Sequence, residues 1–252
     1  MSDGTKDAAA GDDAVPPDAP KPVPTPGHFE PFDGHRPWHA GLLIRFLLEP
    51  QRYAREHLGH ATSAAVTVMT AVCGAAVVSS GYSARIAQQA VRLARGADVP
   101  AALARTAPPW EYFWVTVILG GLLAGVLRWF IGGWWYGVRV GLAGDSRAND
   151  DFARVAYVHA DLLWAAPLVL SAVADTCLYD NFGAAWRAPY HLVVIPALCV
   201  SYWYSYLLVR GSFAVSRPRA LFWFFIGPIL LMIAGQTTAF VAGFVAAMRG
   251  MH

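Results

Sequence analysis

Five ionisable side chains interrupt the long apolar stretches of this sequence: Arg128, His159, Asp161, Asp175 and His191. A charged or titratable group at membrane depth is costly, so each of the five is a candidate functional residue. Groups of these types can form an ion pair, relay protons or ions, or bind a metal.

His159 and Asp161 are two residues apart and therefore face different sides of a helix, which excludes one shared metal site. Asp161 would meet Arg128 if the helices that carry them form an antiparallel hairpin, because the loop between those helices is short. We favour a buried structural ion pair, with a proton or ion relay as the alternative. For Arg128 by itself we predict snorkelling to the membrane boundary rather than a buried functional role, because aromatic residues typical of that boundary follow it: Trp129, Trp134, Trp135 and Tyr136.

Asp175 and His191 could meet near the opposite membrane face, but the third and fourth ligands of a usual metal site are missing. Cys73, Cys177 and Cys199 are isolated and show no CxxC spacing, so we predict neither a metal site nor a cofactor. Metalloprotease, nucleophile-elbow and phosphate-loop motifs are absent from the sequence. We therefore predict that the protein is not an enzyme and has no catalytic residues.

The elements that position these residues are predicted from composition. The 252-residue chain is 56% hydrophobic and 14% charged, whereas a soluble domain is about 25% charged. Its apolar residues form blocks of about 20, long enough to cross the bilayer as helices. We predict an all-α, polytopic bundle whose five spans cover about 61–82, 110–130, 155–178, 190–209 and 220–248. The formal net charge of +2 argues against nucleic-acid binding.

Small residues and prolines predict how these helices pack. Gly121 and Gly125 have the spacing of close helix contacts. Pro167, Pro196 and Pro228 predict kinks in the last three spans.

Two segments precede the first span. Residues 1–40 are rich in proline and poor in large apolar side chains, which predicts a disordered tail. The segment 41–58 is predicted to be amphipathic and to lie on the bilayer. Pro50 divides it into two helical pieces, and its charged residues share one face: Arg45, Glu49, Arg52 and Glu56. Arginines near the span ends favour an N-terminus in the cytoplasm, and the Arg- and Ala-rich composition hints at a bacterial inner membrane.

The segments GGWWYGVRVGLAGD (132–145), ARVAYVHADLLWAAPLVL (153–170) and RFLLEPQRYAREHL (45–58) resemble the bacterial branch of the Yip family of Ypt-interacting proteins. The resemblance covers residues 41–252. It implies a five-helix membrane domain with a cytoplasmic N-terminus and without catalytic residues. Eukaryotic members act in vesicle trafficking and contact Rab GTPases, a role that bacteria have no machinery to carry over.

Together these features predict a non-enzymatic adaptor or membrane-organising scaffold, embedded in lipid and engaging membrane or cytoplasmic proteins. The alternative is a small transporter or channel component in which Arg128 and Asp161 line a path.

Overall fold

The computed structural model describes residues 40–61, 63–93, 107–185 and 190–249, and its secondary structure is helical. In these ranges the one isolated β-bridge joins Pro109 and Asn181. The predicted tail lies outside the described residues. In chain order the helical elements are α1 (Ala40–Leu48), α2 (Pro50–Glu56), the 3-10 turn η1 (Leu58–His60), α3 (Ser63–Leu93), α5 (Trp110–Leu127), the π-helical η2 (Arg128–Gly132), α6 (Gly133–Ala143), α7 (Asp150–Leu178), α8 (Phe182–Ala185), α9 (Tyr190–Ser212), α10 (Arg217–Leu221), the π-helical η3 (Phe222–Ile226) and α11 (Gly227–Arg249).

Four stretches of the described residues are helical, long and apolar enough to cross a membrane, which is consistent with a multi-pass membrane protein: Ser63–Ile86, Trp110–Ala143, Asp150–Leu178 and Arg217–Gly235. They coincide with the first, second, third and fifth predicted spans. The helix α9 covers the remaining prediction, 190–209, but is not among the four. The five-span architecture therefore stays a prediction.

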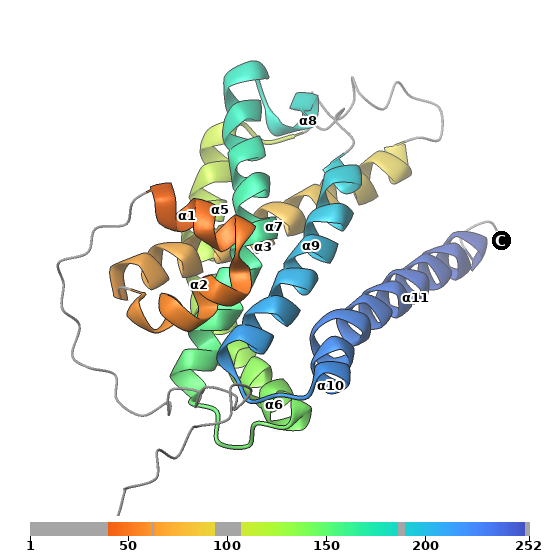
Figure 1. The fold of residues 1–252 in the computed structure, drawn as a ribbon. Coiled ribbons are helices and arrows are strands. Elements are labelled where there is room, and N and C mark those ends of the chain that lie inside the picture. Colours follow the sequence, from red (N-terminus) through yellow and green to blue (C-terminus); the bar gives the residue numbers. More distant parts are fainter. Residues whose placement is uncertain (1–39, 62, 94–106, 186–189, 250–252) are drawn as a thin grey trace, which may run out of the picture.

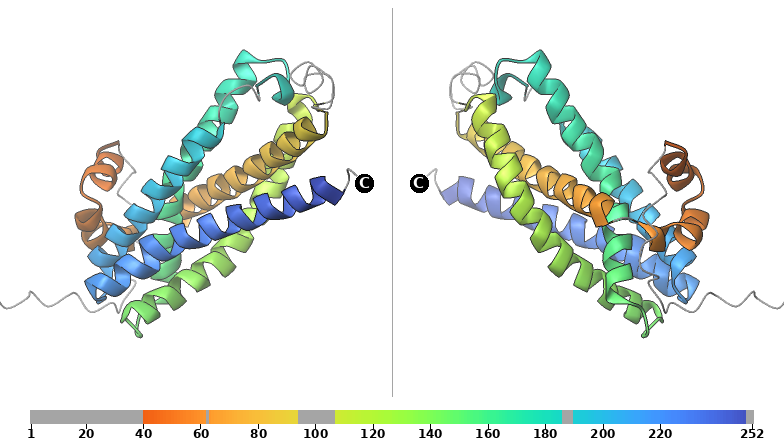
Figure 2. Two further views of the ribbon diagram at one scale, coloured as in Figure 1. Left: turned by 90° about the vertical axis from the view of Figure 1, so that its right-hand side faces the viewer. Right: turned by 90° about the vertical axis from the view of Figure 1, so that its left-hand side faces the viewer.

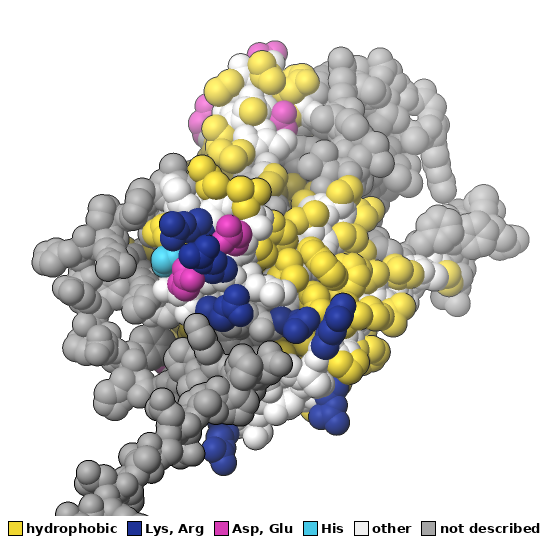
Figure 3. Space-filling view, in the orientation of Figure 1, with side chains coloured by type: hydrophobic (Ala, Val, Ile, Leu, Met, Phe, Trp, Pro, Cys, Tyr) yellow, Lys and Arg dark blue, Asp and Glu magenta, His cyan; other side chains and the backbone are white. Residues whose placement is uncertain are grey.

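The long helices α3, α5, α7 and α9 pack into a bundle, from which α11 diverges (Figures 1 and 2). We call the end that holds residues 144–149 and 213–216 the arginine end, because arginines lie on and beside it. The opposite end, at residues 107–114 and 176–185, is the aromatic end. There Trp110 donates to the carbonyl oxygen of Tyr179 at 2.7 Å, and Phe113 stacks on Phe182 at 4.8 Å between ring centroids. In the space-filling view, basic side chains gather over the lower half of the molecule and apolar surface extends beside them (Figure 3).

Glycines bring α3 and α5 into backbone contact, which confirms the predicted packing role of Gly121 and Gly125. A Cβ atom added to Gly74 would lie 1.9 Å from the carbonyl oxygen of Gly121, and one added to Gly125 would lie 2.7 Å from that of Thr70. Neither separation is sterically allowed, so any larger side chain at these positions would push the two helices apart.

The helix that begins at Trp110 does not end near Phe130, where the sequence places the end of span two, but continues through η2 to Ala143. A rod of 34 residues is about 50 Å long, more than the bilayer core is thick. Gly132 and Gly133 lie in the part of the helix beyond the predicted end. They stay helical because α7 packs closely on them: an added Cβ would lie 2.6 Å from the Tyr157 ring and 2.4 Å from the Arg154 side chain.

The α6–α7 loop at the arginine end has well-defined helix caps. Gly144 adopts a positive φ of 127° just after α6, and the N–H of Asp145 closes the end of that helix on the carbonyl oxygen of Val140 at 3.2 Å. The side chain of Asn149 then accepts from the backbone N–H groups of Asp151 and Phe152, at 2.8 and 3.3 Å, and starts α7. The loop therefore holds α6 and α7 as an antiparallel pair.

Candidate functional site

Arg128 and Asp161 form an ion pair between the first residue of η2 and the middle of α7. The antiparallel arrangement of these helices brings the two residues together, as the sequence suggested. Arg128 Nη2 donates to Asp161 Oδ2, and the indole nitrogen of Trp164 donates to Asp161 Oδ1 at 3.3 Å. Both carboxylate oxygens thus have a donor, which compensates the burial of the charge.

Two aromatic rings complete the surroundings of Arg128. Its guanidinium carbon lies 5.4 Å from the centroid of the Tyr157 ring and 5.6 Å from that of Trp164, within the range of cation–π attraction. The Arg128 side chain is 29% exposed, whereas that of Asp161 is 11% exposed. Arg128 does not lie at the end of its helix, where the sequence placed it, because the helix continues past it. Its guanidinium is held by Asp161 of α7. Its Nε atom is buried and has no hydrogen-bond partner.

His159 faces away from this pair and binds the N-terminal segment instead. Its Nδ1 atom lies 2.8 Å from the carbonyl oxygen of Val155, and its Nε2 atom lies 3.2 Å from the hydroxyl of Tyr53. A carbonyl oxygen can only accept, so Nδ1 carries the proton and Nε2 of the neutral ring accepts from Tyr53. The fully buried His159 is thus an attachment point for α2.

The helices α1 and α2, which we call the α1–α2 hairpin, pack on the bundle through a small aromatic cluster. The ring of Phe46 meets those of Tyr53, His159 and Tyr204 edge-on, at centroid distances of 5.2 to 6.0 Å. The Tyr204 hydroxyl also donates to the carbonyl oxygen of Leu47. The hairpin is therefore docked on α7 and α9, a contact that the sequence interpretation of a segment lying on the bilayer did not include.

Gly211 lets the hairpin approach α9 closely. A Cβ atom added there would lie 2.6 Å from the carbonyl oxygen of Gln51, so the backbones of α2 and α9 are in contact. The predicted division of the segment at Pro50 is confirmed, since α1 ends at Leu48 and Pro50 begins α2.

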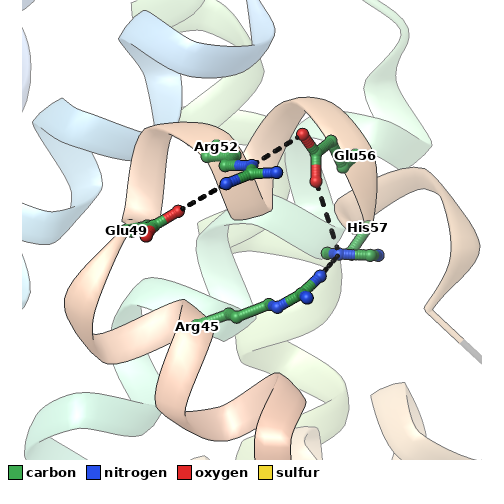
Figure 4. Close-up of polar contacts among 5 residues, drawn as sticks. All are labelled: Arg45, Glu49, Arg52, Glu56 and His57. Atoms are coloured by element: carbon green, nitrogen blue, oxygen red, sulfur yellow. Dashed lines mark hydrogen bonds and ion pairs between the residues drawn. The ribbon is translucent and has the colours of Figure 1, made fainter.

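The outer face of the hairpin carries the charged residues that the sequence placed together (Figure 4). Arg52 bridges Glu49 at 3.3 Å and Glu56 at 2.9 Å, while Arg45 lies 3.5 Å from His57. The hydrogen bond from Arg52 lowers the pKa of Glu56, and burial raises the pKa of Tyr53 on the inner face to about 12. The hairpin thus has a buried aromatic side and a solvated charged side.

A second arginine, Arg139 on α6, joins α6 to the last helix. Its Nη1 atom donates to the carbonyl oxygen of Trp223 at 3.4 Å, and its guanidinium carbon lies 5.0 Å from the centroid of Phe224. In η3 the N–H of Gly227 bonds to Phe222, and the next residue, Pro228, has no N–H to give to Trp223. Arg139 therefore satisfies a carbonyl that the proline leaves open, a contact that no sequence pattern indicated.

The other residues named from the sequence do not join the Arg128–Asp161 pair. Asp175 is buried on α7 near the aromatic end, and His191 lies in the first turn of α9, where its side chain is outside the described residues. Their predicted meeting therefore stays untested. Within the described ranges, no three His, Cys, Asp or Glu side chains are grouped so that they could hold a metal ion.

Comparisons with protein-family models, curated proteins and solved structures give no match to this chain. The resemblance to the Yip family accordingly stays a prediction from the sequence.

Proposed function

We propose that this protein is a non-enzymatic membrane scaffold or adaptor, which holds the α1–α2 hairpin at one membrane face and presents it to protein partners. The observation that carries the proposal is the use of the polar membrane residues to join helices. Asp161 binds Arg128 and Trp164, and His159 binds Val155 and Tyr53. Groups engaged in this way stabilise the bundle and hold the hairpin.

The hairpin itself suits a binding role. Its inner aromatic residues are buried against α7 and α9, while its charged residues stay exposed. Leu48 at the turn between α1 and α2 is 77% exposed. A rigidly docked element that projects charge and an apolar tip gives a partner a defined surface. On this proposal, the N-terminal tail, the hairpin and the α6–α7 loop lie in the cytoplasm of a bacterium, and α9 is a fifth span, as in the Yip family.

A specific observation favours a second candidate function, transport. The π-helical segment η2 begins at Arg128, and π-helical turns in other proteins are frequent at functional sites. The buried Nε atom of Arg128 is also unpaired. On this alternative the pair opens during a transport cycle, and an ion or a small anion passes along Arg128 and Asp161.

Two measurements separate the candidates. A photo-reactive amino acid at Leu48 should cross-link to a discrete protein in native membranes, while one at Leu178, which is 72% exposed at the aromatic end, should not. Proteoliposomes holding the wild-type protein should leak protons, potassium and chloride no faster than empty liposomes. Flux that disappears in Asp161→Asn, together with the absence of a hairpin-specific cross-link, would favour transport and reject the scaffold.

A further inference from the structure

The α9–α10 turn carries three exposed arginines, none of which forms an ion pair with a carboxylate of the residues that the structure describes. Arg210 lies in the last turn of α9, and Arg217 and Arg219 lie on α10. The sequence has no Asp or Glu after Asp180, so no acidic residue of the turn, of α10 or of α11 can neutralise them. In the part of the chain that the structure describes, the carboxylates bound to arginine side chains belong to other pairs, on Arg52, Arg128 and Arg154.

Backbone hydrogen bonds fix the turn that displays these arginines. Asp145 of the α6–α7 loop accepts from the N–H of Ala214 at 3.0 Å, and the N–H of Ser216 donates to the carbonyl oxygen of Ala143 at 3.3 Å. Phe213 is buried and packs on Phe152 at 5.3 Å between ring centroids. The arginines therefore extend from an ordered backbone, which lowers the entropic cost of binding a ligand.

An apolar surface continues directly from the charged turn. Phe222, Ile226 and Leu230, which follow α10 along η3 and α11, are 47%, 40% and 55% exposed. In the space-filling view, dark-blue side chains end where yellow surface begins between α9 and α11 (Figure 3). A ligand that fits this order of surfaces has a negatively charged head and a hydrocarbon body.

We propose that the arginine turn (Arg210, Arg217 and Arg219) and the adjoining apolar face of η3 and α11 bind an anionic phospholipid. Its phosphodiester contacts the arginines, and an acyl chain lies along Phe222, Ile226 and Leu230. Arginine presents a planar set of donors that matches phosphate oxygens. This site goes beyond the scaffold role, because it would bind lipid whether or not the hairpin binds a protein.

The test uses the purified full-length protein in a neutral detergent, titrated with dioleoyl phosphatidylglycerol while its melting temperature is followed. Phosphatidylglycerol should raise the melting temperature saturably, and phosphatidylcholine should raise it far less. Each arginine near an anionic surface contributes about fivefold in affinity. Arg217→Gln/Arg219→Gln should therefore shift the half-saturating lipid concentration upward by about 25-fold.

Two controls isolate the turn. Arg85→Gln removes another exposed arginine, on α3 and close to Tyr82 at the aromatic end, and should leave the titration unchanged. Arg217→Lys/Arg219→Lys keeps the charge and should retain most of the binding. The proposal is overturned if the glutamine variant titrates within twofold of the wild type, if phosphatidylcholine is as effective, or if inorganic phosphate alone gives the same shift at equal concentration.

Discussion

Replacing Arg128 alone should lower the free energy of unfolding more than replacing Asp161 alone. Arg128→Met leaves the Asp161 carboxylate, whose side chain is only 11% exposed, without its cationic partner, although the Trp164 indole still donates to it. An uncompensated charge of this kind costs about 3–5 kcal/mol of stability. Asp161→Asn leaves Arg128 29% exposed and still in cation–π contact with Tyr157 and Trp164. Its cost should therefore be about 1.5–3 kcal/mol, the value of a hydrogen bond to a charged group.

The double variant Arg128→Met/Asp161→Asn should be little worse than Asp161→Asn alone, because no buried charge is then left without a partner. The two substitutions should therefore be coupled by about 2 kcal/mol or more, in the sense that the double variant is more stable than the sum predicts. Equilibrium unfolding in mixed SDS–detergent micelles, followed by tryptophan fluorescence, measures all four free energies of unfolding.

A matched cycle on Arg154 and Asp151 gives the control. These residues form an i,i+3 pair at 2.7 Å on α7, and the Asp151 side chain is 66% exposed. An exposed pair of this kind is worth at most about 1 kcal/mol, so its cycle should show weak coupling. If Arg128 and Asp161 coupled by less than about 0.5 kcal/mol, their effects would be additive within error, and the pair would not be the structural link described here.

Three further predictions concern the helix contacts and the hairpin. Gly74→Ala should cost about 1–3 kcal/mol in the same unfolding assay, because its new methyl group collides with the Gly121 carbonyl. Gly81→Ala on the same helix, with open space around it, should be neutral or stabilising, and equal effects of the two substitutions would argue against the glycine contact. Tyr53→Phe should destabilise the protein by about 1–3 kcal/mol, because it leaves His159 Nε2 buried without a donor. Amide hydrogen exchange in α2 should then accelerate more than in α5, and an equal acceleration in both helices would contradict a docked hairpin. The pKa of Tyr53 is about 12 in the folded protein and about 10 in the unfolded chain. The stabilisation that neutral Tyr53 gives the folded state is therefore complete below pH 10 and is lost as the pH rises toward 12. In this window the free energy of unfolding of the wild type should fall toward that of Tyr53→Phe, and parallel pH curves for the two proteins would refute the linkage.

Local patterns in the sequence predicted the features that depend on neighbouring residues. The break at Pro50, the charged face of the α1–α2 hairpin and the close contact of α5 with α3 at Gly121 and Gly125 each follow from spacing within one or two helical turns. Predicting the pair of Arg128 and Asp161 required one further assumption, that the two helices which carry these residues run antiparallel. The short polar loop between their helices made that assumption reasonable.

Contacts between distant segments were beyond the reach of these patterns. Tyr53 and His159 are 106 residues apart, and nothing in either neighbourhood indicates the other. The continuation of α5 through Gly132 and Gly133 was missed for a related reason. Glycine lowers the local helix propensity, but the packing of Tyr157 and Arg154 against these positions compensates for it, and that packing is a property of the tertiary structure.

Because Arg139 donates to the carbonyl oxygen of Trp223, the substitutions that positions 139 and 228 tolerate depend on each other. While proline occupies position 228, a donor from another helix is needed at that carbonyl, so loss of Arg139 is harmful. Replacement of Pro228 by a residue with an N–H returns a local donor and releases the constraint. The order of substitution therefore matters: a lineage can exchange the proline first and the arginine afterwards at little cost, whereas the reverse order passes through a less stable intermediate.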